Sequence, residues 1–302
     1  MRFFPRPILL AVLIAVSTAS GAMASRPAKR VAPSEPSVPD SLRGRSGQLR
    51  AAVLLPAASD SEATDLGSDA DPRQPRMPAL WSMADSGTGG LFHFIELIPF
   101  AEKQDGRVGA YAVGRFPGER RNSRHREWGV PQGFIALTPE MLSLPVSSHL
   151  TLGDFASLRD QRDVWPRALV LDLRLVDKLE LILAALRDSG HVAPRLKVLS
   201  GFRTPSVTLR NARTASAPDS RHQYGDAADV IVDANGDGRM DDLNRDGRVD
   251  LNDARYLVRI VLAVEAAYPD LIGGIGVYRA TGAAGPFVHV DARGERARWG
   301  VQ

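Results

Sequence analysis

Two histidines and one aspartate carry the clearest chemical signal in this sequence. His222 lies in a polar stretch, and Gly225 and Asp229 follow it along the chain. Asp229 is the one charged residue in the otherwise apolar run 227–232, and a buried carboxylate needs a partner or a cation. His289 lies in the run Phe287–Asp291, where strand alternation places residues 287, 289 and 291 on one face. Brought together, the two imidazoles and the carboxylate would form a metal site.

Such a set of ligands favours zinc chemistry. Three ligands of this kind leave the fourth position of a tetrahedral zinc ion open to water, which is the arrangement used for hydrolysis. Zinc lowers the pKa of its bound water from ~15.7 to ~7 and polarises a scissile carbonyl. A histidine and an aspartate seven positions apart are weak support alone, so the prediction depends on the combination with His289.

A second metal signal lies in the aspartate-rich segment 233–253, between Asp229 and His289. Read from Asp242, this segment follows the twelve-residue EF-hand loop, with Gly247 at the sharp turn and Asp253 at position 12. We therefore expect a structural calcium ion in Asp242–Asp253, which we name loop two. Its ligands would be Asp242, Asn244, Asp246, Asp250, Asp253 and the backbone carbonyl of Arg248.

Loop two resembles the dockerin variant of the EF-hand, because aspartate replaces glutamate at position 12. A helix is expected after it but not before it, so it forms half an EF-hand. An overlapping match, Asp233–Asn244, is named loop one; its position 12 is Asn244, a poor bidentate ligand. We expect calcium in loop two, leave loop one open, and expect calcium to order a wall of the active site.

Three segments of the sequence resemble one enzyme family. Ser220–Asp229 matches the signature Ser-x-His-x-x-Gly-x-Ala-x-Asp of zinc peptidoglycan peptidases of the D-alanyl-D-alanine carboxypeptidase and murein endopeptidase family. Phe287–Asp291 and the tryptophan that follows at 299 look like the third-ligand region of its murein endopeptidase-like branch. Leu199–Thr204 is similar to the strand and turn before the metal motif. The resemblance covers about residues 165–299.

The resemblance implies a Hedgehog/DD-peptidase fold, with His222, Asp229 and His289 as zinc ligands. It implies hydrolysis of the peptide stems or cross-links of bacterial peptidoglycan, with D,D-carboxypeptidase activity as an alternative. Arg203 would hold a substrate carboxylate or stabilise the oxyanion, and a surface salt bridge is an equal alternative. Ser220 would donate to the substrate or only cap its loop.

The general base departs from the family pattern. Relatives often place a glutamate or histidine shortly before the last zinc ligand, but residues 286–288 here are Pro-Phe-Val. Asp291 is the best replacement, or it holds the His289 ring by a hydrogen bond, and both roles stay open. Asp226 is a weaker candidate.

Two further classes of protein compete with the peptidase. Without a base, the protein would be a catalytically inactive, calcium-stabilised peptidoglycan-binding protein. A calcium-dependent docking module would need two good loops and an apolar docking face. A serine hydrolase is disfavoured, because no Gly-x-Ser-x-Gly occurs.

The elements that must position these residues follow from hydrophobic periodicity. Strands are expected at 91–100, 108–113, 133–137, 196–199, 227–232, 275–278 and 287–291. A helix is expected through residues 175–186, with Gly190 after it, and a second through 257–268. The fold class is α+β, with a small β-rich module at 90–163 and a zinc peptidase domain at 164–302 that carries the insertion 233–253.

The first segment of the chain indicates export. Residues 1–24 combine Arg2 and Arg6, an apolar run at 8–16 and an Ala-Met-Ala cleavage site, as in a signal peptide. Nine apolar residues are too few for a membrane span, so none is expected after cleavage, and the protein would be periplasmic or secreted. Residues 25–89, poor in aromatics and rich in Pro, Ser and Ala, are expected to be a disordered linker.

Composition limits the remaining possibilities. The 302 residues are 44% hydrophobic and 24% charged, which are globular proportions. The absence of cysteine excludes disulfides, thiolate metal sites and cysteine nucleophiles. The net charge of +3 would fall to +1 without Arg2 and Arg6, which gives no electrostatic footprint for nucleic acid. Peptidoglycan peptides are the expected partners.

Overall fold

The structure is a computed structural model that describes residues 44, 51–54, 80–84, 91–212, 217–279 and 285–300. The chain divides into two compact units, residues 1–35 and 36–302, and everything described belongs to the second. The predicted signal peptide lies outside the described residues, as does most of the predicted linker.

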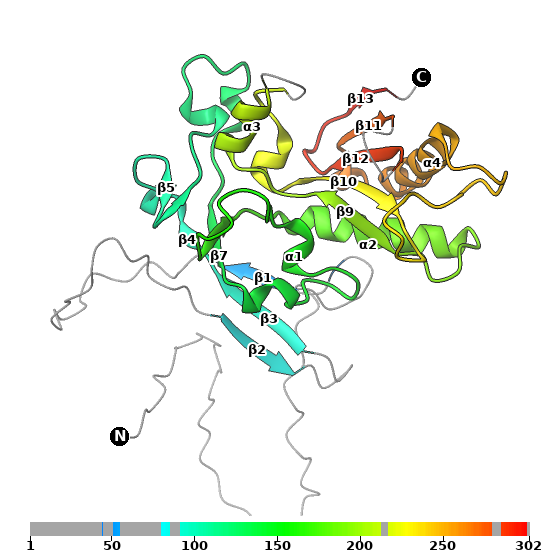
Figure 1. The fold of residues 1–302 in the computed structure, drawn as a ribbon, viewed down its shortest axis with the longest axis horizontal. Coiled ribbons are helices and arrows are strands. Elements are labelled where there is room, and N and C mark those ends of the chain that lie inside the picture. Colours follow the sequence, from blue (N-terminus) through cyan, green and yellow to red (C-terminus); the bar gives the residue numbers. More distant parts are fainter. Residues whose placement is uncertain are drawn as a thin grey trace, which may run out of the picture. The chain divides into compact units, whose positions relative to one another are not determined.

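An α+β architecture surrounds the predicted metal ligands. The central five-stranded sheet has the order β13-β11-β12-β10-β9, and all its neighbours are antiparallel except β11 and β13 (Figure 1). Its strands are β9 (Leu196–Ser200), β10 (Ala227–Val232), β11 (Gly274–Tyr278), β12 (Phe287–Asp291) and β13 (Ala297–Trp299). The predictions for β10 and β12 are confirmed to the residue.

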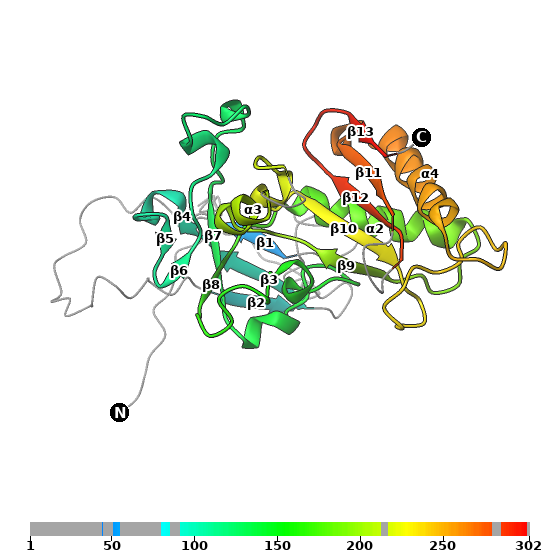
Figure 2. The same cartoon turned by 45° about the horizontal axis from the view of Figure 1, so that its top comes forward.

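Two long helices pack against this sheet. They are α2 (Leu173–Asp188) and α4 (Leu251–Ala267); they contact each other, and α4 contacts β11 and β12 (Figure 2). Asp172 caps α2 by accepting a hydrogen bond from the Arg174 amide, and Asp250 caps α4 in the same way through Asn252. The buried side chains of α2 follow the predicted apolar face, so this prediction is confirmed.

Small sheets and short helices make up the chain before the central sheet and some of the connections between its strands. β1 (Ala52–Leu54) and β2 (Leu80–Ala84) flank β3 (Leu91–Glu96), and β4 (Ile98–Pro99), β7 (Gly133–Leu137) and β8 (Arg167–Leu169) form a second sheet. β5 (Arg107–Val108) and β6 (Tyr111–Ala112) form a hairpin. The short α-helices are α1 (Leu152–Phe155) and α3 (Pro205–Asn211). The 3-10 helices are η2 (Phe100–Glu102), η3 (Pro117–Glu119), η4 (Arg126–Trp128), η5 (Glu140–Ser143), η6 (Arg221–Tyr224) and η7 (Pro269–Leu271).

Three predictions need correction here. The expected linker 25–89 is too long, since β1 and β2 pair with β3 inside the sheet and Ala51 and Ala52 are buried. The expected strand at 108–113 is part of a hairpin, and the expected strand at 91–100 breaks at Leu97. One continuous core includes buried residues of both expected regions, from Phe116 and Phe134 to Val230 and Val288. Folding therefore joins the β-rich region to the sheet that carries the site.

No helix among the described residues is long and apolar enough to cross a membrane.

Candidate metal centre

The backbone around His222 is shaped to hold its ring in one orientation. His222 lies in η6, and Gly225 ends this helix with a φ of +67°. A Cβ at Gly225 would lie 2.1 Å from the carbonyl oxygen of Val170, so only glycine fits this turn. The His222 ring is 1% exposed, and its Nδ1–H donates a hydrogen bond of 2.7 Å to the carbonyl of Gly201. This bond directs Nε2 toward the centre of the site.

Sheet register brings the other two residues together. Asp229 of β10 is directly opposite His289 of β12 in the antiparallel ladder. Val288 and Val290, both fully buried, alternate with His289 and face the core, so the imidazole projects from the opposite face of the sheet. Residues 60 positions apart in the chain thereby become cross-strand neighbours.

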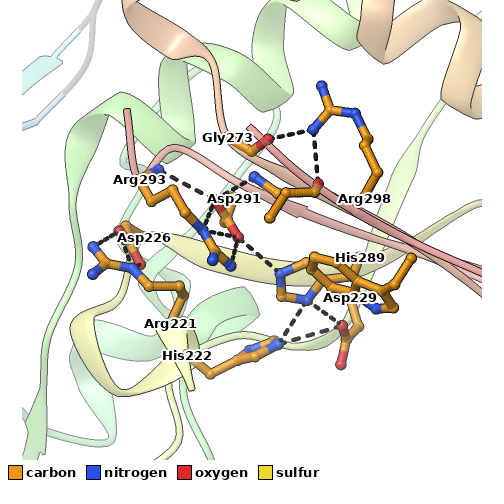
Figure 3. A network of polar contacts seen from close by, with 12 residues as sticks. Arg221, His222, Asp226, Asp229, Gly273, His289, Asp291, Arg293 and Arg298 are labelled. Carbon is orange, nitrogen blue, oxygen red and sulfur yellow. Dashed lines mark hydrogen bonds and ion pairs between the residues drawn. The ribbon is translucent and has the colours of Figure 1, made fainter. Parts of the chain in front are cut away.

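Three ligand atoms form a nearly equilateral triangle (Figure 3). The His222 Nε2–His289 Nδ1 distance is 3.2 Å, the His289 Nδ1–Asp229 Oδ1 distance is 3.0 Å and the His222 Nε2–Asp229 Oδ1 distance is 3.3 Å. Ligands at 2.0–2.1 Å from a tetrahedral zinc ion lie about 3.3–3.4 Å from one another. The three predicted ligands therefore converge with the spacing of a metal site.

The protonation pattern of this triangle also favours a cation. Because Gly201 and Asp291 accept from the outer ring nitrogens, the inner nitrogens of both neutral imidazoles carry lone pairs. Two lone pairs and a carboxylate oxygen would then face one another with no donor between them. Burial lowers the pKa of His222, which keeps that ring neutral and able to bind a metal.

The ligand set also favours the protonated form of His289. Burial acts to lower the pKa of His289, but hydrogen bonds to Asp229 and Asp291 outweigh it and raise that pKa. Both imidazoles hold the pKa of the Asp229 carboxyl well below its usual range against the effect of burial. The cluster therefore attracts positive charge.

Asp291 lies behind His289, away from the three ligand atoms (Figure 3). The Nε2–H group of His289 donates to Asp291 Oδ2 over 3.2 Å, and the Gly274 amide and the Arg293 guanidinium donate to the same carboxylate. Asp291 is fully buried, so a substrate cannot reach it. Of its two predicted roles, this geometry supports orientation of the ring and not the role of general base.

Asp226, the weaker candidate for a base, also faces away from the ligands. Its carboxylate pairs with the Arg221 guanidinium and is 1% exposed. Burial raises its pKa to about 6, against the effect of Arg221. It lies at a different pocket, of about 500 Å³, between Arg174 and Tyr224.

Arg203 lies beside the metal ligands as predicted. Its Nη2 is 3.7 Å from Asp229 Oδ2, and its Nε is buried with no hydrogen-bond partner among the described residues. The side chains of Arg203 and Asp229 are 22% and 14% exposed, so the cluster reaches the surface on their side. Arg203 also lines a pocket of about 530 Å³ with Ser200 and Phe202. Arg203 therefore places a positively charged side chain at the open side of the cluster.

Ser220 is not among the ligands. It precedes η6, its backbone carbonyl accepts from the Gln223 amide, and its side chain makes no capping hydrogen bond. Ser220 therefore occupies the N-cap position of η6 through its backbone alone, and its two proposed side-chain roles stay predictions.

An aromatic cluster that the motif did not indicate covers one side of the site. The Trp299 ring lies 5.0 Å from the His289 ring, and Trp299 Nε1 donates to the Tyr278 hydroxyl over 2.7 Å. Tyr278 stacks on Phe287 with ring centres 4.8 Å apart. Gly276 is opposite both His289 and Trp299, and a Cβ there would lie 2.2 Å from Trp299 Nε1. In the sequence, Gly276 is the signal that could have indicated this cluster, because a residue without a side chain leaves room for the Trp299 ring.

A buried ionic network supports the strand that carries His289. Lys178 of α2 donates to Glu265 of α4 over 2.7 Å and to the backbone carbonyl of Asp291 over 2.6 Å. Glu265 also accepts from the Gly273 amide and from Arg298. Lys178 and Glu265 are 0% and 1% exposed. The network ties both helices to the end of β12.

Loop two is placed at the other end of β10 from Asp229. The amides of Asp246 and Gly247 donate to the Asp242 carboxylate, as in a formed EF-hand loop. Asp253, in the first turn of α4, is fully buried and accepts hydrogen bonds from the amides of Leu243, Asn244 and Asp250. These bonds connect loop two to the helix.

The insertion contacts a different part of the fold from the one expected. Its hydrogen bonds to the rest of the chain run from Asp233, Asp241 and Arg245 to backbone carbonyls of Arg195, Val232 and Gly190. Arg195 and Val232 lie at the ends of β9 and β10 that are away from Asp229, and Gly190 follows α2. The described contacts therefore do not support an insertion that forms a wall of the metal site.

A comparison with protein-family models found no matching family, and comparisons with curated proteins and with solved structures found no significant match.

Proposed function

We propose that this protein is an exported zinc metallopeptidase that hydrolyses peptide stems or cross-links of bacterial peptidoglycan. The observation that carries the proposal is the triangle of His222 Nε2, His289 Nδ1 and Asp229 Oδ1, whose sides of 3.0–3.3 Å suit a tetrahedral ion. Imidazole and carboxylate ligands suit zinc, and three of them leave a position for water. The substrate class comes from the resemblance of three sequence segments to a Hedgehog/DD-peptidase family.

In this proposal, the zinc ion, Arg203 and Asp291 each have a separate role in hydrolysis. Bound zinc would supply an acidified water and polarise the scissile carbonyl. Arg203 would donate to the substrate carboxylate or to the developing oxyanion, because its side chain is partly exposed and borders the open side. Asp291 would hold the His289 ring in its binding orientation.

A binding protein without hydrolysis is the second candidate. The specific observation in its favour is that Asp291 and Asp226 are both buried and bonded elsewhere, so neither predicted base faces the open side of the triangle. In either case we propose that loop two binds calcium as a structural ion and that the protein acts in the periplasm or outside the cell.

Digestion of purified peptidoglycan, with metal analysis of the same samples, tests the proposal. We compare the wild type with His222→Ala and with the matched control His149→Ala, whose ring contacts Glu180 outside the site. The wild type and the control should each hold one zinc ion and change the muropeptide pattern, whereas His222→Ala should do neither.

The products separate the alternatives. Cleavage of cross-linked dimers would identify an endopeptidase, and release of free D-alanine alone would identify a carboxypeptidase. Zinc present in the wild type with an unchanged muropeptide pattern would contradict hydrolysis and support the binding protein.

A further inference from the structure

The two aspartate-rich loops adopt the same backbone-to-carboxylate pattern, one after the other. In each loop the amides of positions 5, 6 and 7 donate to the side chains at positions 3, 1 and 5. The loop-one bonds are Asp237 N to Asn235 Oδ1 at 2.9 Å, Gly238 N to Asp233 Oδ2 at 2.9 Å and Arg239 N to Asp237 Oδ1 at 2.8 Å. The loop-two bonds are Asp246 N to Asn244 Oδ1 at 3.0 Å, Gly247 N to Asp242 Oδ2 at 2.7 Å and Arg248 N to Asp246 Oδ1 at 2.9 Å. This repetition alone does not show that either loop binds an ion.

Loop one differs from loop two in one respect that points to a ligand. Asp233, at its first position, is 4% exposed, and its Oδ1 is a buried atom with no hydrogen-bond partner among the described residues. Its other oxygen accepts from Gly238 N, so the carboxylate is seated inside the loop. A buried carboxylate oxygen without a partner is costly, unless a cation is bound to it.

The ion pair between Lys197 and Asp233 is long and involves the other carboxylate oxygen. Lys197 is the near ammonium group, but its Nζ is 3.8 Å from Asp233 Oδ2, beyond hydrogen-bond range, and its side chain is 48% exposed. Asp241, later in the loop, has its Oδ2 bonded to the amide of Ala234 over 2.8 Å.

Loop one is also anchored to the core and to the end of β10. Met240, at position 8 of loop one, is 2% exposed and packs in the core, whereas Val249, the equivalent residue of loop two, is 46% exposed. The amide of Asp241 continues the backbone bonding by donating to the carbonyl of Val232, at the end of β10. A rigid attachment to the sheet holds the ligands in position and lowers the ordering cost of binding.

We infer that loop one binds a calcium ion of its own through Asp233, Asn235, Asp237, Asp241 and the carbonyl of Arg239. These five positions supply oxygen ligands only, as calcium requires, and water would complete the six to eight ligands of the ion. Asn244 stays with loop two, because its amide nitrogen donates to Asp246 over 3.0 Å and its oxygen accepts from the Asp246 amide. The segment that the sequence left open is thus a second calcium site, distinct from loop two.

Calcium titration of the metal-depleted full chain, by calorimetry and by equilibrium dialysis, tests this inference. The wild type should bind two calcium ions per chain, and the loop-two variant Asp242→Asn/Asp246→Asn should keep one. Adding Asp237→Asn to that variant should weaken the remaining site at least ~10-fold, since an exposed ligand is lost without a change in the core. Adding Asp188→Asn, an exposed carboxylate on α2, is the matched control and should leave the affinity unchanged.

Two results would overturn the inference. The first is a folded loop-two variant, by circular dichroism, that binds no calcium up to about 10 mM, well above the range of extracellular sites. The second is an equal effect of Asp237→Asn and Asp188→Asn. If the loop-two variant does not fold, Asp233→Asn in the wild-type chain decides, because it should reduce two bound ions to one. The readout is a calcium count, so it is independent of zinc and of hydrolysis.

Discussion

Replacement of Lys178 by methionine tests whether the buried network under the metal site is a real ion pair. Lys178 is 0% exposed and bonds to Glu265 and to the carbonyl of Asp291 at 2.7 and 2.6 Å. Removing one partner of a buried pair costs about 3–5 kcal/mol, because the other charge stays buried. Arg298 still pairs with Glu265 in the variant, so we expect the low end, about 3 kcal/mol.

Urea denaturation followed by circular dichroism measures this loss. With a slope of ~3 kcal/mol per molar urea, a loss of about 3 kcal/mol lowers the midpoint by ~1 M. Lys197→Met is the matched control; its side chain is 48% exposed and 3.8 Å from Asp233, so its loss should stay below ~1 kcal/mol in calcium-free buffer. Equal shifts for the two variants would refute the assignment of Lys178 as a buried, paired ammonium.

Three further outcomes are expected. Calcium at about 100 times its Kd should raise the free energy of unfolding by ~2.7 kcal/mol per site, and a chelator that leaves zinc bound should remove this gain; an unchanged unfolding curve would count against both calcium sites. Asp291→Asn should weaken zinc binding ~10–100-fold in a competition assay, because His289 loses its charged partner, and unchanged affinity would exclude the orienting role. Gly276→Ala should cost ~1–3 kcal/mol in urea denaturation, because its Cβ would lie 2.2 Å from Trp299 Nε1, and a neutral change would show that the indole moves freely.

Local patterns predicted the elements that carry the metal ligands. The apolar run with a single charge gave the bounds of β10, and alternation in Phe287–Asp291 placed His289 and Val288 on opposite faces of β12. These patterns depend on nearest neighbours in the sequence, so they need no tertiary information. The choice of the three ligands came from spacing together with a family resemblance, and the structure brings those ligand atoms together.

What the sequence could not predict depends on long-range register. The pairing of Asp229 with His289 brings the carboxylate and the imidazole together, and it depends on the register of β10 and β12. Likewise, only the folded chain shows that Asp291 is buried behind the His289 ring. The place of Trp299 over His289 requires the parallel pairing of β13 with β11, which no short pattern encodes. The linker prediction was too long for a related reason, because a composition poor in aromatics still provided the short strand β1, which pairs with β3.

Crystals grown with zinc, measured at the zinc absorption edge, test the central claim most directly. We predict one anomalous peak about 2.0–2.2 Å from His222 Nε2, His289 Nδ1 and a carboxylate oxygen of Asp229, with a water at the fourth position. A zinc-soaked crystal with no peak at this triangle, or with the peak elsewhere and the three side chains bonded only to one another, would contradict the account.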